Sequence, residues 1–228
     1  MKKEILAIAV LLLFALCGYG QVSWNVKAGM NVSKVTNYSA MDSDSDMKPG
    51  YQFGVGLDYY FTNHWGIQPL LMIVSKGYKT QGDYYFHIGD PLTEPLYGWS
   101  NKQTQDRIYL EMPVMLAYRI NVSNSLKLVI NGGGYVSYGI VGKHNVTNTS
   151  PEGSKDKWFF NIFELQPHWG EIKKIDYGLG AGTALEFKNR YSVSLFGEWG
   201  LTSADTNVSS WSRKNANHTY GLNIGYKF

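Results

Sequence analysis

The chain is poor in cysteine, in long apolar runs and in net charge, and each shortage excludes a class of protein. Its only cysteine among 228 residues is Cys17, so no disulfide can form within the chain. Beyond residue 16, no segment is apolar for long enough to cross a membrane as a helix. The 21 basic and 18 acidic residues nearly balance, which argues against a nucleic-acid partner.

The N-terminal residues 1–20 have the pattern of a secretory signal peptide. Two lysines precede the apolar run 5–16, and the small-residue frame 18–20 follows it. Cleavage after this frame would leave a mature chain, 21–228, without any cysteine. Lipid attachment at Cys17 is the alternative, but the residue before it is a leucine where such sites have a small residue.

Aromatic residues and glycine are abundant, and they fall in segments that alternate every second residue. Aromatic residues make up 15% of the chain, which also contains 25 glycines. Large apolar side chains alternate with small or polar ones, as in a β-strand. Eight such segments are predicted as strands: 22–35, 51–62, 65–78, 107–120, 126–141, 175–187, 191–201 and 218–228. Each is long enough to cross a bilayer at a tilt, which takes about 9 to 11 residues.

The connections between these segments alternate between short and long. Short polar turns follow the second, fourth and sixth segments, and long polar loops follow the first, third, fifth and seventh: 36–50, 79–106, 143–174 and 202–217. Bacterial outer-membrane barrels have this topology and an even number of strands. We predict an all-β, eight-stranded antiparallel up-and-down transmembrane β-barrel over 21–228, in the outer membrane and without a second domain. A soluble β-protein with an aromatic core is the alternative.

Aromatic side chains gather near both ends of the predicted strands. A turn-side belt contains Trp24, Tyr59, Phe61, Trp65, Tyr118, Phe187, Tyr191, Tyr226 and Phe228. A loop-side belt contains Tyr51, Tyr78, Tyr109, Tyr138, Tyr177, Trp199 and Tyr220. Aromatic side chains are favoured at both interfaces of a membrane, so two belts are expected of a barrel that spans it.

Charged side chains within the strands share one face, which we expect to be the lumen. Since an eight-stranded barrel is only wide enough for side chains to fill, these charges should neutralise one another. The predicted structural network contains Lys27, Asp58, Arg107, Glu111, Arg119, Lys127, Asp176, Glu186, Glu198 and Lys227. By the same parity Lys76 and Lys188 also point inward. A catalytic pair of Glu111 with Glu186 or Glu198 is the alternative.

One long loop has the composition of an acidic, calcium-like segment. Residues 42–46 alternate aspartate and serine, as at the start of a calcium-binding loop. However, Met47 stands where such a loop has glycine, and Phe53 where it has glutamate. We predict a solvated acidic loop and no metal site.

The loop 143–174 contains more aromatic residues than a hydrophilic connection needs. They are Trp158, Phe159, Phe160, Phe163 and Trp169, with Ile162 between them. We expect them to fold over the barrel rim or to rest on the lipid surface. The alternative is an anchor patch for a partner protein or glycan, because exposed apolar patches mark interaction sites.

Several motifs together resemble the PorT-like outer-membrane barrels of the Bacteroidota. The segment 108–116 is similar to that family's signature of Tyr-Leu-Glu, an aliphatic residue and Pro, and the segments 133–138, 176–182 and 222–228 match its later strands. The resemblance covers nearly all of the mature chain. One departure is Leu70, where many members have a glutamate after Gln-Pro. The resemblance implies an outer-membrane barrel and, through a member linked to protein secretion, an accessory place in a secretion assembly.

These observations favour a monomeric, plugged barrel with a structural or surface-interaction role through its extracellular loops. The alternatives are an accessory component of a secretion assembly, a narrow solute channel and a lipid-modifying enzyme. No histidine stands beside a serine in a recognisable catalytic arrangement, so we expect no enzyme, no catalytic residue and no cofactor. The expected partners are outer-membrane lipid and lipopolysaccharide, an envelope or secretion-system protein, and the barrel-assembly machinery. By resemblance to other outer-membrane proteins, that machinery would read Tyr226 and Phe228 as an assembly signal.

Overall fold

The fold consists of long antiparallel strands. The computed structural model describes residues 21–36, 45–87, 96–161, 163, 173–202 and 216–228. Within these ranges lie nine strands: β1 (Gln21–Val35), β2 (Asp46–Tyr60), β3 (Trp65–His87), β4 (Leu96–Asn121), β5 (Leu126–Thr149), β6 (Lys155–Asn161), β7 (Ile175–Phe187), β8 (Tyr191–Gly200) and β9 (Asn217–Lys227). No helix in the described ranges is long and apolar enough to cross a membrane. The predicted signal peptide, 1–20, lies outside them.

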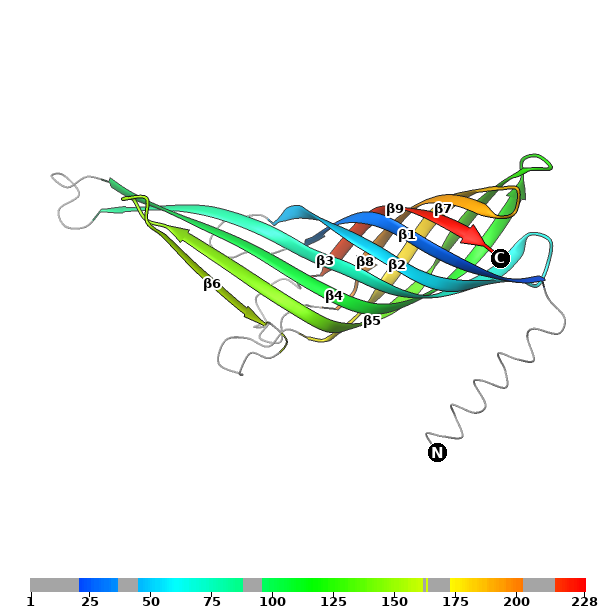
Figure 1. The fold of residues 1–228 in the computed structure, drawn as a ribbon, viewed down its shortest axis with the longest axis horizontal. Coiled ribbons are helices and arrows are strands. Elements are labelled where there is room, and N and C mark those ends of the chain that lie inside the picture. The colour runs from blue at the N-terminus through cyan, green and yellow to red at the C-terminus, as the bar shows by residue number, and fades with distance from the viewer. Residues whose placement is uncertain (1–20, 37–44, 88–95, 162, 164–172, 203–215) are drawn as a thin grey trace, which may run out of the picture.

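Eight of these strands form a closed ring, as the sequence predicts. The sheet order is β4-β3-β2-β1-β9-β8-β7-β5-β6, and an additional pairing of β4 with β5 closes it (Figure 1). β1 pairs with β9, so the first and last described strands are neighbours. β6 is the ninth strand and stands outside the ring. It pairs with the outer part of β5, beyond the point where β7 begins.

One side of the barrel is much taller than the other (Figure 1). β3, β4 and β5 contain 23, 26 and 24 residues, whereas β7, β8 and β9 contain 13, 10 and 11. The predicted loop 79–106 was therefore wrong over most of its length, because β3 and β4 stay paired out to His87 and Leu96. The predicted loop 143–174 was wrong in the same way, since β5 continues to Thr149 and β6 pairs with it. We call the outer parts of β3, β4 and β5, with β6, the projecting sheet.

The predicted apolar outside is present in all eight ring strands, and the inside is mostly polar, with an apolar stretch on β3. Large apolar side chains such as Val55, Leu71 and Ile224 are exposed on the outside, while Asp58, Glu111 and Lys227 are buried. The turn-side belt points outward, as do Tyr51, Tyr138, Tyr177, Trp199 and Tyr220 of the loop-side belt. Tyr78 and Tyr109 were wrongly placed in that belt. Both are buried in the lumen, because they share the parity of Lys76 and Arg107.

A β-bulge marks where β5 leaves the membrane-spanning part of the barrel. The register with β4 shifts so that Tyr109 faces Gly139 and Ile108 faces Val141. One extra residue stands on β5, and consecutive Ile140 and Val141 are therefore both exposed. Beyond the bulge the inward positions of β5 have even numbers instead of odd ones.

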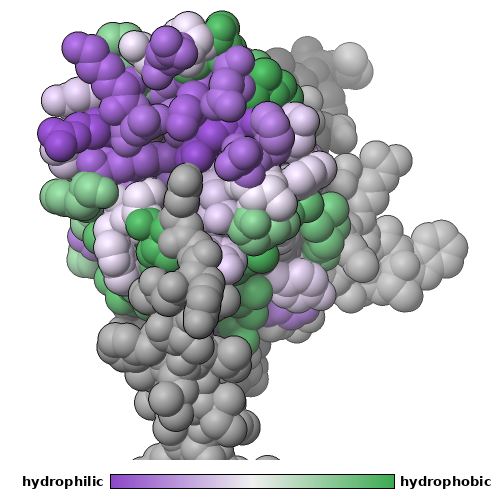
Figure 2. Space-filling model, turned by 90° about the vertical axis from the view of Figure 1, so that its right-hand side faces the viewer, coloured by the Kyte–Doolittle hydropathy of each residue, from purple (hydrophilic) through white to green (hydrophobic). Residues whose placement is uncertain are grey.

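The short turns gather at the opposite end, near both ends of the described chain. Figure 2 views this end and shows hydrophilic residues on the side that carries the β4–β5 and β7–β8 turns. Lys188 and Asn189 have φ of 51° and 55° in a turn closed by the Arg190 amide donating to the Phe187 carbonyl. Two central residues with positive φ match the twist of a hairpin. The inward position predicted for Lys188 was wrong, because this side chain belongs to the exposed turn.

Candidate functional site

The lumen contains a charged cluster near the turn end of the barrel. The Lys227 Nζ atom lies 2.5 Å from Asp58 Oδ2 and also pairs with Glu186. Arg119 Nη2 lies 3.4 Å from Glu186 Oε2, and its guanidinium stacks 3.4 Å from the Tyr60 ring centroid. Four strands, β2, β4, β7 and β9, thus meet through these charges. We call Asp58, Arg119, Glu186 and Lys227 the inner cluster.

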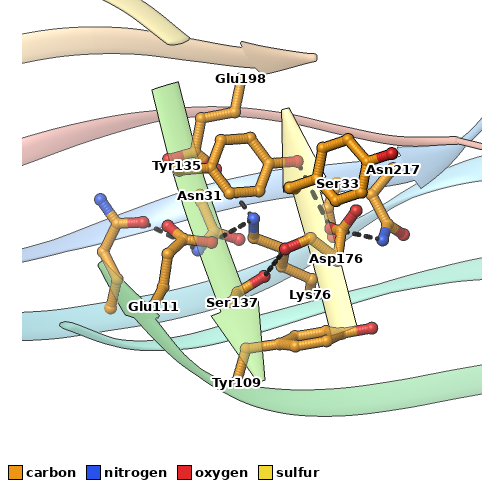
Figure 3. A network of polar contacts seen from close by, with 12 residues as sticks. Asn31, Ser33, Lys76, Tyr109, Glu111, Tyr135, Ser137, Asp176, Glu198 and Asn217 are labelled. Carbon is orange, nitrogen blue, oxygen red and sulfur yellow. Dashed lines mark hydrogen bonds and ion pairs between the residues drawn. The ribbon is translucent and has the colours of Figure 1, made fainter. Parts of the chain in front are cut away.

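A second charged cluster lies nearer the outer end and is centred on Lys76 (Figure 3). Lys76 Nζ lies 2.6 Å from Glu111 Oε2, 2.9 Å from Glu198 Oε2 and 4.4 Å from the Tyr135 ring centroid. The Tyr135 hydroxyl donates to Asp176 Oδ2 at 3.3 Å. Room for this ring comes from Gly178, where a Cβ would lie 2.7 Å from Tyr135 Cε1.

Asn217 extends this cluster from Asp176 to Arg107. Its Nδ2 donates to Asp176 Oδ2 at 2.9 Å, and its Oδ1 accepts from Arg107 Nη2 at 2.7 Å. Arg107 Nη1 also donates to the Tyr109 hydroxyl at 3.2 Å. We call Lys76, Arg107, Glu111, Asp176 and Glu198 the outer cluster. Sequence parity placed Lys76 inward but did not identify it as the centre of the network.

An apolar and amide layer separates the two clusters. Leu70, Met72 and Val74 form a buried apolar cluster on the lumen face of β3. At the same level Gln52 donates to Asn223 Oδ1 at 2.5 Å, and Asn131 donates to Gln68 Oε1 at 3.0 Å. A cavity of about 50 Å³ lies here, which is room for only a few water molecules. Leu70, the departure from the PorT-like pattern, is therefore part of an apolar layer.

The remaining predicted lumen residues lie where parity puts them. Lys27 and Lys127 are half-buried on the inner face. Neither takes part in the ion pairs found among the described residues. Glu111 and Glu198 do come together, but Lys76 lies between them and all three are almost fully buried. The two buried carboxylates thus share one lysine.

The described aromatic side chains of the predicted partner loop lie on different faces. Trp158 is 54% exposed and lies on the same face of the sheet as its cross-strand neighbour Val146. Phe159 is 78% exposed and lies on the opposite face of β6. Phe163 was wrongly included, because its ring packs 6.3 Å from Tyr109 and its atoms leave no room for a Cβ on Gly139. The side chain of Phe160 and all of Trp169 lie outside the described residues.

The lumen-side face of the projecting sheet carries amides and tryptophans. Asn101 donates to Asn148 Oδ1 at 2.6 Å, and Gln103 donates to Asn101 Oδ1 at 2.9 Å. The His144 ring contacts Gln103 Oε1 at 3.2 Å. Burial and the nearby positive charge of Arg107 lower the pKa of His144, so its ring is neutral at pH 7. Trp99 and Trp158 are exposed on this face.

The predicted assembly residues lie at the seam of the barrel. Tyr226 packs against Tyr191 and Phe228, with ring centroids 5.5 and 5.2 Å away. The Phe228 amide donates to the Trp24 carbonyl at 2.9 Å. The described residues include no group of three metal-ligating side chains. Of the acidic loop, 42–44 lie outside the described residues, and Asp46 begins β2.

The closed ring, the apolar outside, the aromatic belts and the polar lumen together define a transmembrane β-barrel. The family described as an outer membrane protein beta-barrel domain matches residues 18–206. The chain therefore belongs to this family and is a protein of the bacterial outer membrane.

Solved structures of small outer-membrane proteins are similar to this chain at low sequence identity. Ail, the attachment invasion locus protein of Yersinia pestis, is 13% identical, with a TM-score of 0.36 over 90% of this chain and 98% of that one. OprG from Pseudomonas aeruginosa is 14% identical, with a TM-score of 0.40 over 92% and 98%. Outer membrane protein W of E. coli is 12% identical, with a TM-score of 0.40 over 90% and 97%. No curated protein matches the sequence.

Proposed function

We propose that this protein is a plugged barrel that captures a protein partner through its projecting sheet. The observation that carries this proposal is the exposure of aromatic side chains on strands that continue beyond the membrane. Tyr85, Trp99, Trp158 and Phe159 are all exposed there. Large aromatic side chains are the residues on which interfaces most often depend. A barrel with only a structural role would gain nothing by holding them in water.

The experiment compares two single substitutions on intact cells. Trp158→Ser and Phe159→Ser each remove one aromatic side chain from one face of β6. If the sheet binds a protein, at least one variant loses a stoichiometric partner that is cross-linked to the wild-type protein and co-purifies with it. Asp156→Ser is the matched control, since it changes an exposed residue of the same strand and keeps both aromatics. Unchanged capture by both variants would overturn the proposal.

A place in a secretion assembly is the second candidate, favoured by the motif that resembles PorT-like barrels. Tyr109, Glu111 and Pro113 of this motif are successive lumen-facing residues, and Glu111 pairs with Lys76. The motif thus supplies part of the outer cluster. Purification of the protein from its native envelope distinguishes the two candidates. A secretion component should retain other envelope subunits at fixed stoichiometry, and its deletion should stop export of their cargo.

The filled lumen argues against the channel alternative. Charged clusters and an apolar layer occupy it at successive levels, with the 50 Å³ cavity between them. We expect no large, stable openings in planar-bilayer conductance recordings. Such openings would refute the plug.

A further inference from the structure

The outward face of the projecting sheet carries a group of lysines. Lys79, Lys102, Lys143, Lys155 and Lys157 share the parity that turns Ile108 and Leu110 toward lipid farther down β4. The register places Gln81, Lys102, Thr147 and Lys157 in one row across four strands. We call the five lysines Lys79, Lys102, Lys143, Lys155 and Lys157 the lysine face. Its residues belong to β3, β4, β5 and β6, so only the folded sheet brings them onto one face.

Carboxylates of the protein neutralise only part of this face. Asp106 pairs with Lys48 and stands across from Lys143, and Asp46 stands across from Lys79. Thr147 is the cross-strand neighbour of both Lys102 and Lys157, and Thr149 is that of Lys155. These three exposed lysines thus have no carboxylate directly across from them within the described residues. Asp83 also stands on this face, diagonal to Lys102, so the five lysines meet three carboxylates and an anion from outside the chain would complete the charge balance.

The position of the lysine face indicates which anion is available. The face continues the lipid-facing surface without interruption, since the outward row of β4 runs from Leu110 through Ile108 to Lys102. Lys102 lies eight residues beyond Leu110, which is about 26 Å along an extended strand. Lys102 and Lys157 are two strands apart, or about 10 Å. Because Leu110 pairs with Tyr138 of the loop-side belt, Lys102 and Lys157 lie beyond the membrane interface, on the side to which the saccharide headgroups of the outer leaflet extend.

We propose that the lysine face binds the phosphorylated saccharide headgroup of lipopolysaccharide. Lysine is a point-charge ligand for phosphate, and basic residues beside a membrane attract anionic lipid headgroups. Bound lipid would hold the projecting sheet against the leaflet surface by its outward side. The tryptophans of the opposite face would stay free. Trp99 and Trp158 on the opposite face remain for the proposed protein partner, whereas Tyr85 and Phe159 stand on the lysine face itself.

The test measures binding of fluorescent lipopolysaccharide to the purified, detergent-solubilised protein by anisotropy. The Lys102→Gln, Lys157→Gln double variant should weaken binding about 25-fold, at about fivefold per lysine. Wild-type affinity should fall as salt increases, because headgroup contacts at this surface are screened. Lipopolysaccharide stripped of phosphate should bind the wild-type protein no better than intact lipopolysaccharide binds the variant.

The matched control removes two charges from the other end of the barrel. Lys188→Gln with Arg190→Gln changes the exposed β7–β8 turn and should leave binding within about twofold, since this end faces away from the outer leaflet. Unchanged affinity of the lysine-face variant would overturn the proposal, as would an equal loss in the turn variant. A lysine-dependent interaction with soluble heparin but not with lipopolysaccharide would also overturn it. Circular dichroism verifies that both variants keep the barrel.

Discussion

The tall and short sides of the barrel have the same alternation within the membrane and differ beyond it. On the short side, β8 ends at Gly200 and β9 begins at Asn217, both near the loop-side belt. On the tall side, the side chains of β3, β4 and β5 still alternate between inward and outward positions, but the residue types at these positions are different. Lysines appear among the outward positions, and amides and Trp99 appear among the inward ones. The same strand pattern thus serves a lipid boundary in one region and two water-exposed surfaces in the other.

The lumen and the projecting sheet also differ in how they satisfy polar groups. Lumen charges such as Lys76 and Lys227 are almost fully buried and are paired with carboxylates from other strands. The amides of the projecting sheet are half-exposed and bond mainly to each other. Because an unpaired group costs more in a dry environment than in water, stability should depend on the lumen far more than on the sheet.

The largest effect is expected from removing the cation at the centre of the outer cluster. Lys76→Met leaves Glu111 and Glu198 buried beside each other without their shared partner. Breaking a buried pair in this way typically costs about 3 to 5 kcal/mol of unfolding free energy. Urea unfolding of the refolded protein in lipid vesicles measures it. The triple variant Lys76→Met, Glu111→Gln, Glu198→Gln should recover most of the loss, and a loss below about 1 kcal/mol in the single variant would contradict this account.

Sequence periodicity predicted the part of the fold that lies in the membrane, because lipid on one side and a polar lumen on the other impose opposite solvents. All eight predicted strands are present, and 175–187 has the predicted bounds. Beyond the membrane both faces meet water, so apolar alternation fades and strand residues look like loop residues. For this reason the loop predicted over 79–106 was wrong for 79–87 and 96–106, which continue a paired hairpin.

The pairing of lumen charges could not be predicted from the sequence. Parity says which side chains point inward, but the stagger between strands decides which of them share a level. Lys76 and Glu198 are 122 residues apart and meet only because the closed ring sets their heights. The bulge at Ile140 and Val141 likewise has no signal in the alternation before it, and it determines the faces of the β5 extension.

The next largest effect compares one substitution in the two solvents that the outward face meets. Ile224→Arg puts a charge on the lipid side of β9 between the aromatic belts, which should cost about 2 to 4 kcal/mol of unfolding free energy. Phe159→Arg makes a similar change on the outward face of β6 and should alter it by less than about 0.5 kcal/mol. Both are measured by urea unfolding in vesicles. Equal costs would show that the projecting sheet also lies in lipid.

The smallest effects come from two asparagines that make the same kind of bond in the two regions. Asn25→Ala removes the amide that donates to Asp58 Oδ1 at 3.1 Å in the inner cluster, and a hydrogen bond to a charged group is worth about 1.5 to 3 kcal/mol. Asn148→Ala removes the acceptor of the Asn101 amide, which water can replace, so it should cost below about 1 kcal/mol.

Hydrogen exchange shows which strands lose amide protection in each variant. Asn148→Ala should speed exchange only in the outer parts of β4 and β5, because those residues open without the ring. Asn25→Ala should instead reduce protection across β1 and β2, since Asp58 joins them to β9 through Lys227. If Asn148→Ala lowered protection in the ring strands as well, the projecting sheet would be part of the same cooperative unit as the barrel. The tall side would then contribute to the stability of the barrel, not only to the surface that it presents.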